Sequence, residues 1–154
     1  MSSINNKASH RLYYLRQLKR AGLSARELIQ VYLSMTRPVA EYACQVWSTS
    51  LTEENKQQLE SIQKRAFKII APNLSYSEAL QRHQIQTLEA RRDVLCRTLF
   101  RDIMAHPENK LYNLLPPERV NTYEIRNFKK YSLPRTKTER FKSSFINWGL
   151  FNCQ

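Results

Sequence analysis

Glycine is almost absent from this chain, and its scarcity limits the folds open to it. Gly22 and Gly149 are the only two glycines among 154 residues. Hairpin turns and phosphate-cradling loops depend on glycine, which adopts positive φ angles without steric cost. Apolar residues make up 42% of the chain, as in an ordinary globular protein with a real core. The sequence therefore predicts long helices joined by a few loops.

Capping signals divide the first 117 residues into helices. Ser24 with Glu27, and Ser75 with Glu78, have the spacing of capping boxes, and Gly22 supplies a stop for the helix before it. Helices are predicted to begin near residues 3, 24, 38, 52, 75 and 87, with a last helical turn at 110–115. Each long helix carries one apolar stripe, of which Leu59–Ile62–Ala66–Ile69 is the clearest.

Two segments do not show this pattern of a single apolar stripe. The string PVAEYACQVW at 38–47 is apolar and rich in small side chains, so a continuous helix near the centre is expected. After Pro117 no 3.6-residue period persists, and the alternation from Tyr123 to Leu133 favours extended chain. The predicted fold is therefore mainly α, with a bundle of five to six helices over 1–117 and an irregular, partly extended C-terminal arm over 118–154.

The charge balance points to a polyanionic partner. The 25 basic and 13 acidic residues give a formal charge of +12. Nucleic acid is the commonest partner of such a chain, and an anionic membrane surface is the next. No apolar run approaches the roughly 18 residues of a membrane span, and the N-terminus lacks a secretory signal. An intracellular protein without a membrane partner is expected, with nucleus and cytoplasm both open.

Basic residues gather most densely near the C-terminus. Between residues 126 and 142 there are seven cations and one acid, Glu139, interleaved with Phe128, Tyr131 and Phe141. Cations neutralise phosphates, and aromatic faces stack on unpaired bases. The alternative is a solvated tail whose aromatic side chains pack on the bundle. The candidate nucleic-acid-binding residues here are Arg126, Lys129, Lys130, Arg135, Lys137, Arg140 and Lys142.

Pairs of cations one helical turn apart give a second signal. Like charges at this spacing destabilise an isolated helix, and a bound phosphate would reverse that effect. Arg16 and Arg20 have no acid near them and carry the strongest signal. By contrast, the arginines at 91, 92, 97 and 101 have acids at helical spacing, which favours a solvent-exposed face of ion pairs. The candidates in this set are Lys7, Arg11, Arg16, Lys19, Arg20, Lys64 and Lys68.

No catalytic constellation is present in the sequence. Glu41 has no second acid nearby and is expected to pair with Arg37. His10, His83 and His106 are isolated, and no P-loop, G-x-S-x-G or paired-aspartate motif occurs. Three widely spaced cysteines indicate neither disulfides nor a zinc site, and two of them, Cys44 and Cys96, read as core residues. The chain is expected to use no metal, cofactor or small-molecule substrate.

An ordered series of strings resembles the region after the palm in LINE-type (non-LTR) retrotransposon reverse transcriptases. The strings are KASHRLYYLRQLKRAGLS, ELIQVYLSMTRPVAEYACQVW, IQKRAFKIIAPNLSYSEALQRHQIQTLEARRDVLC and SLPRTKTERFKSSFINWGLFN, and they span about residues 7–154. Gln45 stands where that family often has proline, and Phe151-Asn152 where it often has Trp-Asn. The first string also resembles a short N-terminal segment of AlkB-homologue tRNA-modifying proteins, but the H-x-D…H iron ligands of an AlkB dioxygenase are absent.

The resemblance implies a nucleic-acid-gripping thumb and C-terminal segment of an RNA-directed DNA polymerase, without the catalytic palm. The family's metal-binding aspartates have no counterpart here, so no catalytic residue carries over and the chain itself is not expected to be an enzyme. The implied partner is RNA or an RNA/DNA template-primer, and the implied grip falls on the helix from Lys7 to Arg20. The alternative is a non-catalytic helical interaction module that docks on a palm or self-associates, with incidental basic charge.

Overall fold

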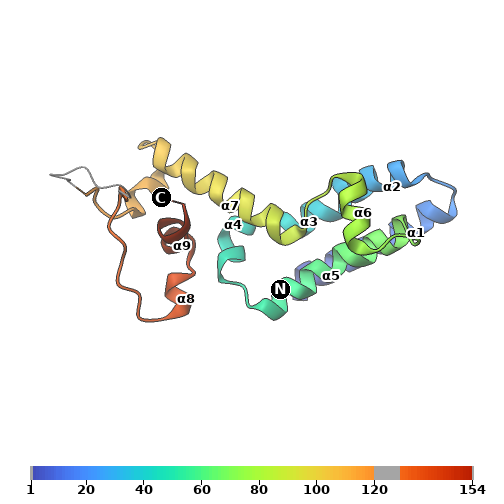
Figure 1. Ribbon diagram of the computed structural model, residues 1–154, viewed down its shortest axis with the longest axis horizontal. Helices are drawn as coiled ribbons and strands as arrows, with labels where there is room; N and C mark the ends of the chain where they lie inside the picture. The colour runs from blue at the N-terminus through green and yellow to red at the C-terminus, as the bar shows by residue number, and fades with distance from the viewer. Residues whose placement is uncertain (1, 120–128, 154) are drawn as a thin grey trace. The chain divides into compact units, whose positions relative to one another are not determined.

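The computed structural model describes residues 2–119 and 129–153, which are mainly α-helical (Figure 1). Within these ranges there is no strand, only an isolated antiparallel bridge between Glu118 and Tyr131. The predicted fold class is confirmed. The helices are α1 (Ser2–Arg20), α2 (Ala25–Val31), α3 (Arg37–Glu41), α4 (Cys44–Trp47), α5 (Glu53–Ile70), α6 (Tyr76–His83), α7 (Leu88–Ala105), α8 (Glu139–Lys142) and α9 (Phe145–Asn152), with a π-helical turn at Tyr32–Thr36 and 3-10 turns at Ser48–Ser50 and Lys110–Leu114.

The predicted helix ends are confirmed by their capping contacts. Ser24 and Ser75 each form a complete capping box, in which the serine N–H donates to Glu27 or Glu78 at 2.8 Å. These hydrogen bonds lower the pKa of both glutamates. Gly22, at φ +92°, ends α1 with a pair of backbone bonds, from Gly22 N–H to the Lys19 carbonyl and from the next N–H to the Leu18 carbonyl.

The continuous helix predicted for 38–47 is wrong. Pro38 has no N–H to donate, and the chain before it widens into a π turn in which the Arg37 N–H donates to the Tyr32 carbonyl. The helix then breaks at Tyr42, and Ala43 takes a positive φ of 49°. Tyr42 is 78% exposed and Val46 80%, so this segment is not the centre of the fold. Small apolar side chains supplied the pattern, but only Ala40 and Cys44 are buried.

The described chain forms two compact units. Unit 1 comprises residues 1–44 and 51–92, and unit 2 comprises 45–50 and 93–154. The division therefore falls within α7. The predicted boundary between the helical bundle and the C-terminal arm, near residue 118, lies inside unit 2. In unit 1, buried apolar side chains come from α1, α2, α5, α6 and the start of α7, with Leu12, Leu15, Leu28, Ile62 and Phe67 among them.

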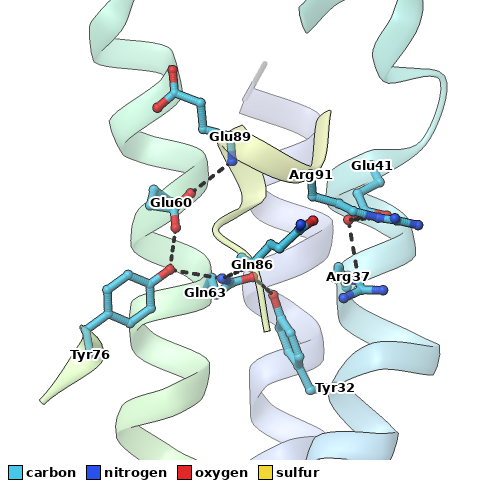
Figure 2. Close-up of polar contacts among 9 residues, drawn as sticks. All are labelled: Tyr32, Arg37, Glu41, Glu60, Gln63, Tyr76, Gln86, Glu89 and Arg91. Carbon is cyan, nitrogen blue, oxygen red and sulfur yellow. Dashed lines mark hydrogen bonds and ion pairs between the residues drawn. The ribbon is translucent and has the colours of Figure 1, made fainter. Parts of the chain in front are cut away.

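A buried polar network also holds unit 1 together (Figure 2). The Tyr32 hydroxyl donates to Gln63 Oε1 at 2.6 Å, and Gln63 Nε2 donates to the Tyr76 hydroxyl and the Gln86 carbonyl, both at 3.0 Å. Tyr76 in turn donates to Glu60. Burial, and for Tyr76 the Glu60 carboxylate, raise the pKa of both tyrosines. With its side-chain oxygen and nitrogen both engaged, Gln63 joins the π turn, α6 and the loop between α6 and α7 to α5.

Charged residues lie next to this network, and for one of them, Arg92, the sequence prediction was wrong. Glu41 pairs with Arg37 at 3.4 Å, as expected, and also with Arg91 at 3.7 Å (Figure 2). Arg92, predicted on a solvent-exposed face, is instead only 1% exposed, and burial lowers its pKa, opposed by Glu60. Of the acids that favour its charged form, Glu89 lies within one helical turn, but Glu60 and Glu41 come from distant parts of the chain, so local spacing did not reveal its burial.

Unit 2 is organised around an apolar cluster of Phe100, Tyr131 and Leu150. The helix α9 was not predicted, because its sequence is apolar nearly throughout and shows no amphipathic period. Gly149 lets α9 pack directly against Phe100 of α7, since a side chain at this position would overlap the Phe100 ring. Cys44 in unit 1 and Cys96 in unit 2 are buried, as predicted.

Candidate nucleic-acid interface

The helix α1 is the most uniformly basic element of unit 1. It carries five cations and no acid over its 19 residues. Ala8, Leu12 and Leu15 face the core, which leaves the cations on the flanks and outer side of the helix. Arg16 and Arg20, one turn apart, are both exposed. The pair with the strongest sequence signal is therefore accessible to a ligand.

The helix α5 runs beside α1 in the same direction (Figure 1). Arg65 Nη1 donates to Ser9 Oγ at 3.3 Å, and Lys19 Nζ donates to the Ile69 carbonyl at the end of α5. Ser9 and Arg16 are seven residues apart, or nearly two turns, so they share one flank of α1. The exposed Arg65 and Lys68, three residues apart, share a side of α5. We define the α1–α5 basic surface as four exposed cations of this helix pair, Arg16, Arg20, Arg65 and Lys68.

Neither α1 nor residues 61–70 of α5 contain a carboxylate that could neutralise the α1–α5 basic surface. Residues 61–70 of α5 contain three cations and no acid, as α1 contains five and none. In the described ranges, the ion pairs of unit 1 join Glu41 to Arg37 and Arg91, and Lys56 to Glu53 and Glu89. None involves the α1–α5 basic surface. Arg65 was not among the candidate binding residues predicted from the sequence. The only indication in the sequence was that Arg65 lies outside the apolar stripe Leu59–Ile62–Ala66 of its helix.

The other predicted cations of unit 1 have separate environments. Lys19 already donates to a backbone carbonyl at the C-terminal end of α5, where it offsets the partial negative charge of the helix end. Lys64 lies over the Tyr76 ring, 5.6 Å from its centroid. Lys7 and Arg11 lie on the other flank of α1, and Arg11 Nη1 donates to the Met35 carbonyl at 2.6 Å. The seven predicted cations of unit 1 therefore do not form one surface.

In unit 2, the predicted basic arm is partly neutralised by carboxylates. Lys130 pairs with Glu118 at 2.8 Å, which raises the pKa of Lys130 and lowers that of Glu118. Lys142 pairs with Glu139 at 3.8 Å. Arg126 lies outside the described residues, and Lys129 is half-buried. The candidates that remain exposed and have no ion pair in the described part of this unit are Arg135, Lys137 and Arg140.

Of the aromatic side chains interleaved with these cations, the structure describes two, of which one is buried and one is exposed. Tyr131, a predicted base-stacking residue, is buried in the apolar cluster with Phe100, so it is not available to a ligand. Phe141 is 51% exposed. Phe128 lies outside the described residues. The packed alternative for these aromatics therefore holds for Tyr131, because its ring completes the core that α9 and α7 form in unit 2.

No family model, curated protein or solved structure matches this chain. Among the described residues, no three His, Cys, Asp or Glu side chains gather where they could hold a metal ion. Within the same ranges, no helix has the length and apolar character needed to cross a bilayer. The α1–α5 basic surface is accordingly the strongest candidate for a functional site.

Proposed function

We propose that this chain grips nucleic acid by its sugar-phosphate backbone, in the manner of the LINE-type polymerase thumb that its sequence resembles, and performs no catalysis. The observation that carries the proposal is the parallel pairing of α1 with α5. The exposed Arg16 and Arg20 belong to one helix of this pair and the exposed Arg65 and Lys68 to the other, and there is no carboxylate in α1 or in the second half of α5. Contacts of this kind position a duplex without reading its sequence.

Electrostatics favour a phosphate ligand for this surface. Like charges one helical turn apart cost each helix about 0.2–0.5 kcal/mol, and a phosphate lying between them turns repulsion into attraction. Binding also releases the counterions that had condensed on the nucleic acid. If the four cations of the surface each meet one phosphate, raising the salt concentration fourfold lowers affinity about 150-fold.

Charge substitutions test the proposal directly. We expect the Arg16→Gln/Arg20→Gln variant to bind an RNA/DNA hybrid duplex more weakly, and its slope of log K against log salt to be shallower by about 1.8. The matched control is Arg26→Gln/Arg82→Gln, which removes two exposed cations of unit 1 from other helices. Fluorescence anisotropy at several salt concentrations measures both quantities. Equal losses in the two variants would mean that net charge, and not this surface, drives binding.

A second candidate function is protein–protein association, either self-association or docking on another domain such as a polymerase palm. Exposed apolar residues favour it, since Tyr42 and Val46 have most of their surface in solvent. In this case nucleic-acid binding is unaffected by the Arg16/Arg20 substitutions. Sedimentation velocity of wild type and a Val46→Ser variant separates the two functions, because self-association through this segment weakens only in the variant.

A further inference from the structure

A groove lies in unit 1 on the flank of α1 that faces away from the α1–α5 basic surface. It is open to solvent, has a volume of about 720 Å³ and is lined by Asn6, Lys7, His10, Arg11, Tyr14 and Met35. One wall is the first half of α1, and the other is the π turn at Tyr32–Thr36. This volume falls in the range of about 300–1,000 Å³ that is usual for small-ligand sites.

One contact ties the two walls of the groove together, and two ring contacts within α1 orient Tyr14. Arg11 Nη1 donates to the Met35 carbonyl at 2.6 Å, which ties α1 to the π turn. His10 and Tyr14 pack edge to face, with ring centroids 5.9 Å apart at 89°. Tyr13 meets Tyr14 in a similar geometry at 5.8 Å. Tyr14 is nevertheless 47% exposed and Met35 40%, so the groove offers an oriented aromatic ring and a thioether to a ligand.

We infer that this groove binds one unpaired nucleotide of an RNA strand. An aromatic ring accepts the face of a base, and a nearby cation neutralises its phosphate. Tyr14 supplies the ring, and Lys7, exposed and without an ion pair in the described ranges, supplies the charge. With Lys7 and Arg11 in its lining and no acid in α1, the groove favours an anionic ligand. The inference rests on the proposed function and adds a single-stranded element to it.

The two binding features lie on different flanks of one helix. Tyr13, His10 and Gln17 occupy the outer side of α1 between them, and all three positions have solvent access. A duplex seated on the α1–α5 basic surface can therefore pass its unpaired end around α1 into the groove. The chain should prefer a junction between duplex and single strand to either a blunt duplex or a single strand alone.

Two RNA hairpins of equal phosphate count test this inference. One carries an unpaired adenosine tail, and the other extends its stem by the same number of nucleotides to a blunt end. We expect the tailed hairpin to bind the wild type at least about fivefold more tightly, the effect of stacking one base. Tyr14→Leu should bring the ratio close to one and leave blunt-hairpin affinity unchanged. Tyr14→Phe, which retains the ring, should preserve the ratio.

Controls separate the groove from the basic surface. Tyr42→Leu removes an exposed tyrosine that neither lines the groove nor packs on Tyr14 in the described contacts, and it should retain the preference. Lys7→Gln, a surface change with no described contact, should lower the preference without unfolding α1, which far-UV circular dichroism checks. Arg16→Gln/Arg20→Gln should weaken both hairpins alike and leave their ratio intact.

Each outcome decides one of the two proposals. A ratio unchanged by both Tyr14→Leu and Lys7→Gln overturns the groove while leaving the basic surface standing. Equal effects of Tyr42→Leu and Tyr14→Leu overturn it as well. If the Arg16/Arg20 variant binds like wild type while Tyr14→Leu abolishes the preference, the groove stands and the backbone grip fails. No binding of either hairpin by the wild type overturns both.

Discussion

At the scale of single residues, Gly149 sets how closely α9 packs on Phe100. Its Cα lies so near the ring that a methyl group would overlap it, and Phe100 is fully buried. We expect Gly149→Ala to lower the free energy of unfolding by about 1–3 kcal/mol, although alanine is the better helix former. Thermal denaturation followed by tryptophan fluorescence measures the loss. A Gly149→Ala/Phe100→Leu double variant should recover part of it, and a stable single variant would contradict this packing.

The protonation state of His106, which directly follows α7, makes the stability of this region depend on pH. Its Nδ1 lies 2.9 Å from the Asp102 carbonyl and 3.0 Å from Asp102 Oδ1, and these contacts raise its pKa. A raised pKa means that folding favours the protonated ring. The stabilisation is therefore complete below the unfolded pKa of about 6.5 and is lost as pH rises through the higher folded value. An NMR titration should show the His106 pKa falling in Asp102→Asn; an unchanged pKa would refute the link.

At the scale of elements, the Tyr32–Gln63–Tyr76 network is the main polar tie between helices of unit 1. Tyr32→Phe leaves the buried Gln63 Oε1 without its donor, which should cost about 1–3 kcal/mol of unfolding free energy. Tyr76→Phe should cost less, because Gln63 Nε2 still reaches the Gln86 carbonyl. Urea denaturation compares the two variants. Tyr13→Phe, on the surface, is the control and should leave the midpoint unchanged.

Helix ends could be predicted from the sequence because their causes are local. The capping boxes at Ser24 and Ser75 and the stop at Gly22 each depend on residues within one turn. The break at Tyr42–Ala43 was not predictable in this way, because small apolar residues suit both a helix and a bend. The helix α9 was also missed, since nearly every residue in it is apolar and a uniform stretch has no period.

The candidate site could be predicted only in part for the same reason. The exposed pair Arg16–Arg20 follows from the apolar stripe of α1, which is a property of one helix. The contribution of Arg65 depends on α5 lying parallel to α1, which is a tertiary property. Likewise, the burial of Arg92 and Tyr131 depends on partners from distant segments. A pattern within one element cannot reveal such partners.

At the scale of the whole molecule, the formal charge of +12 should make stability depend on salt. Repulsion among unpaired cations opposes folding, and salt screens it over a Debye length of about 10 Å at 0.1 M. In the absence of nucleic acid, we expect the melting temperature to rise between 20 and about 300 mM NaCl. Arg16→Gln/Arg20→Gln should raise it at low salt and reduce its salt dependence. A melting temperature that falls with NaCl would show that attractive ion pairs dominate.

The division of the chain into two units places both tryptophans in the same unit. Trp47 and Trp148, the two tryptophans of the sequence, both belong to unit 2, whereas the helical signal arises in both units. Emission excited at the red edge of the indole absorption therefore monitors one unit alone, and ellipticity averages over both. Coincident transitions by the two probes would mark a single cooperative species. Separate transitions would assign an intermediate to whichever unit melts later, without labelling the protein.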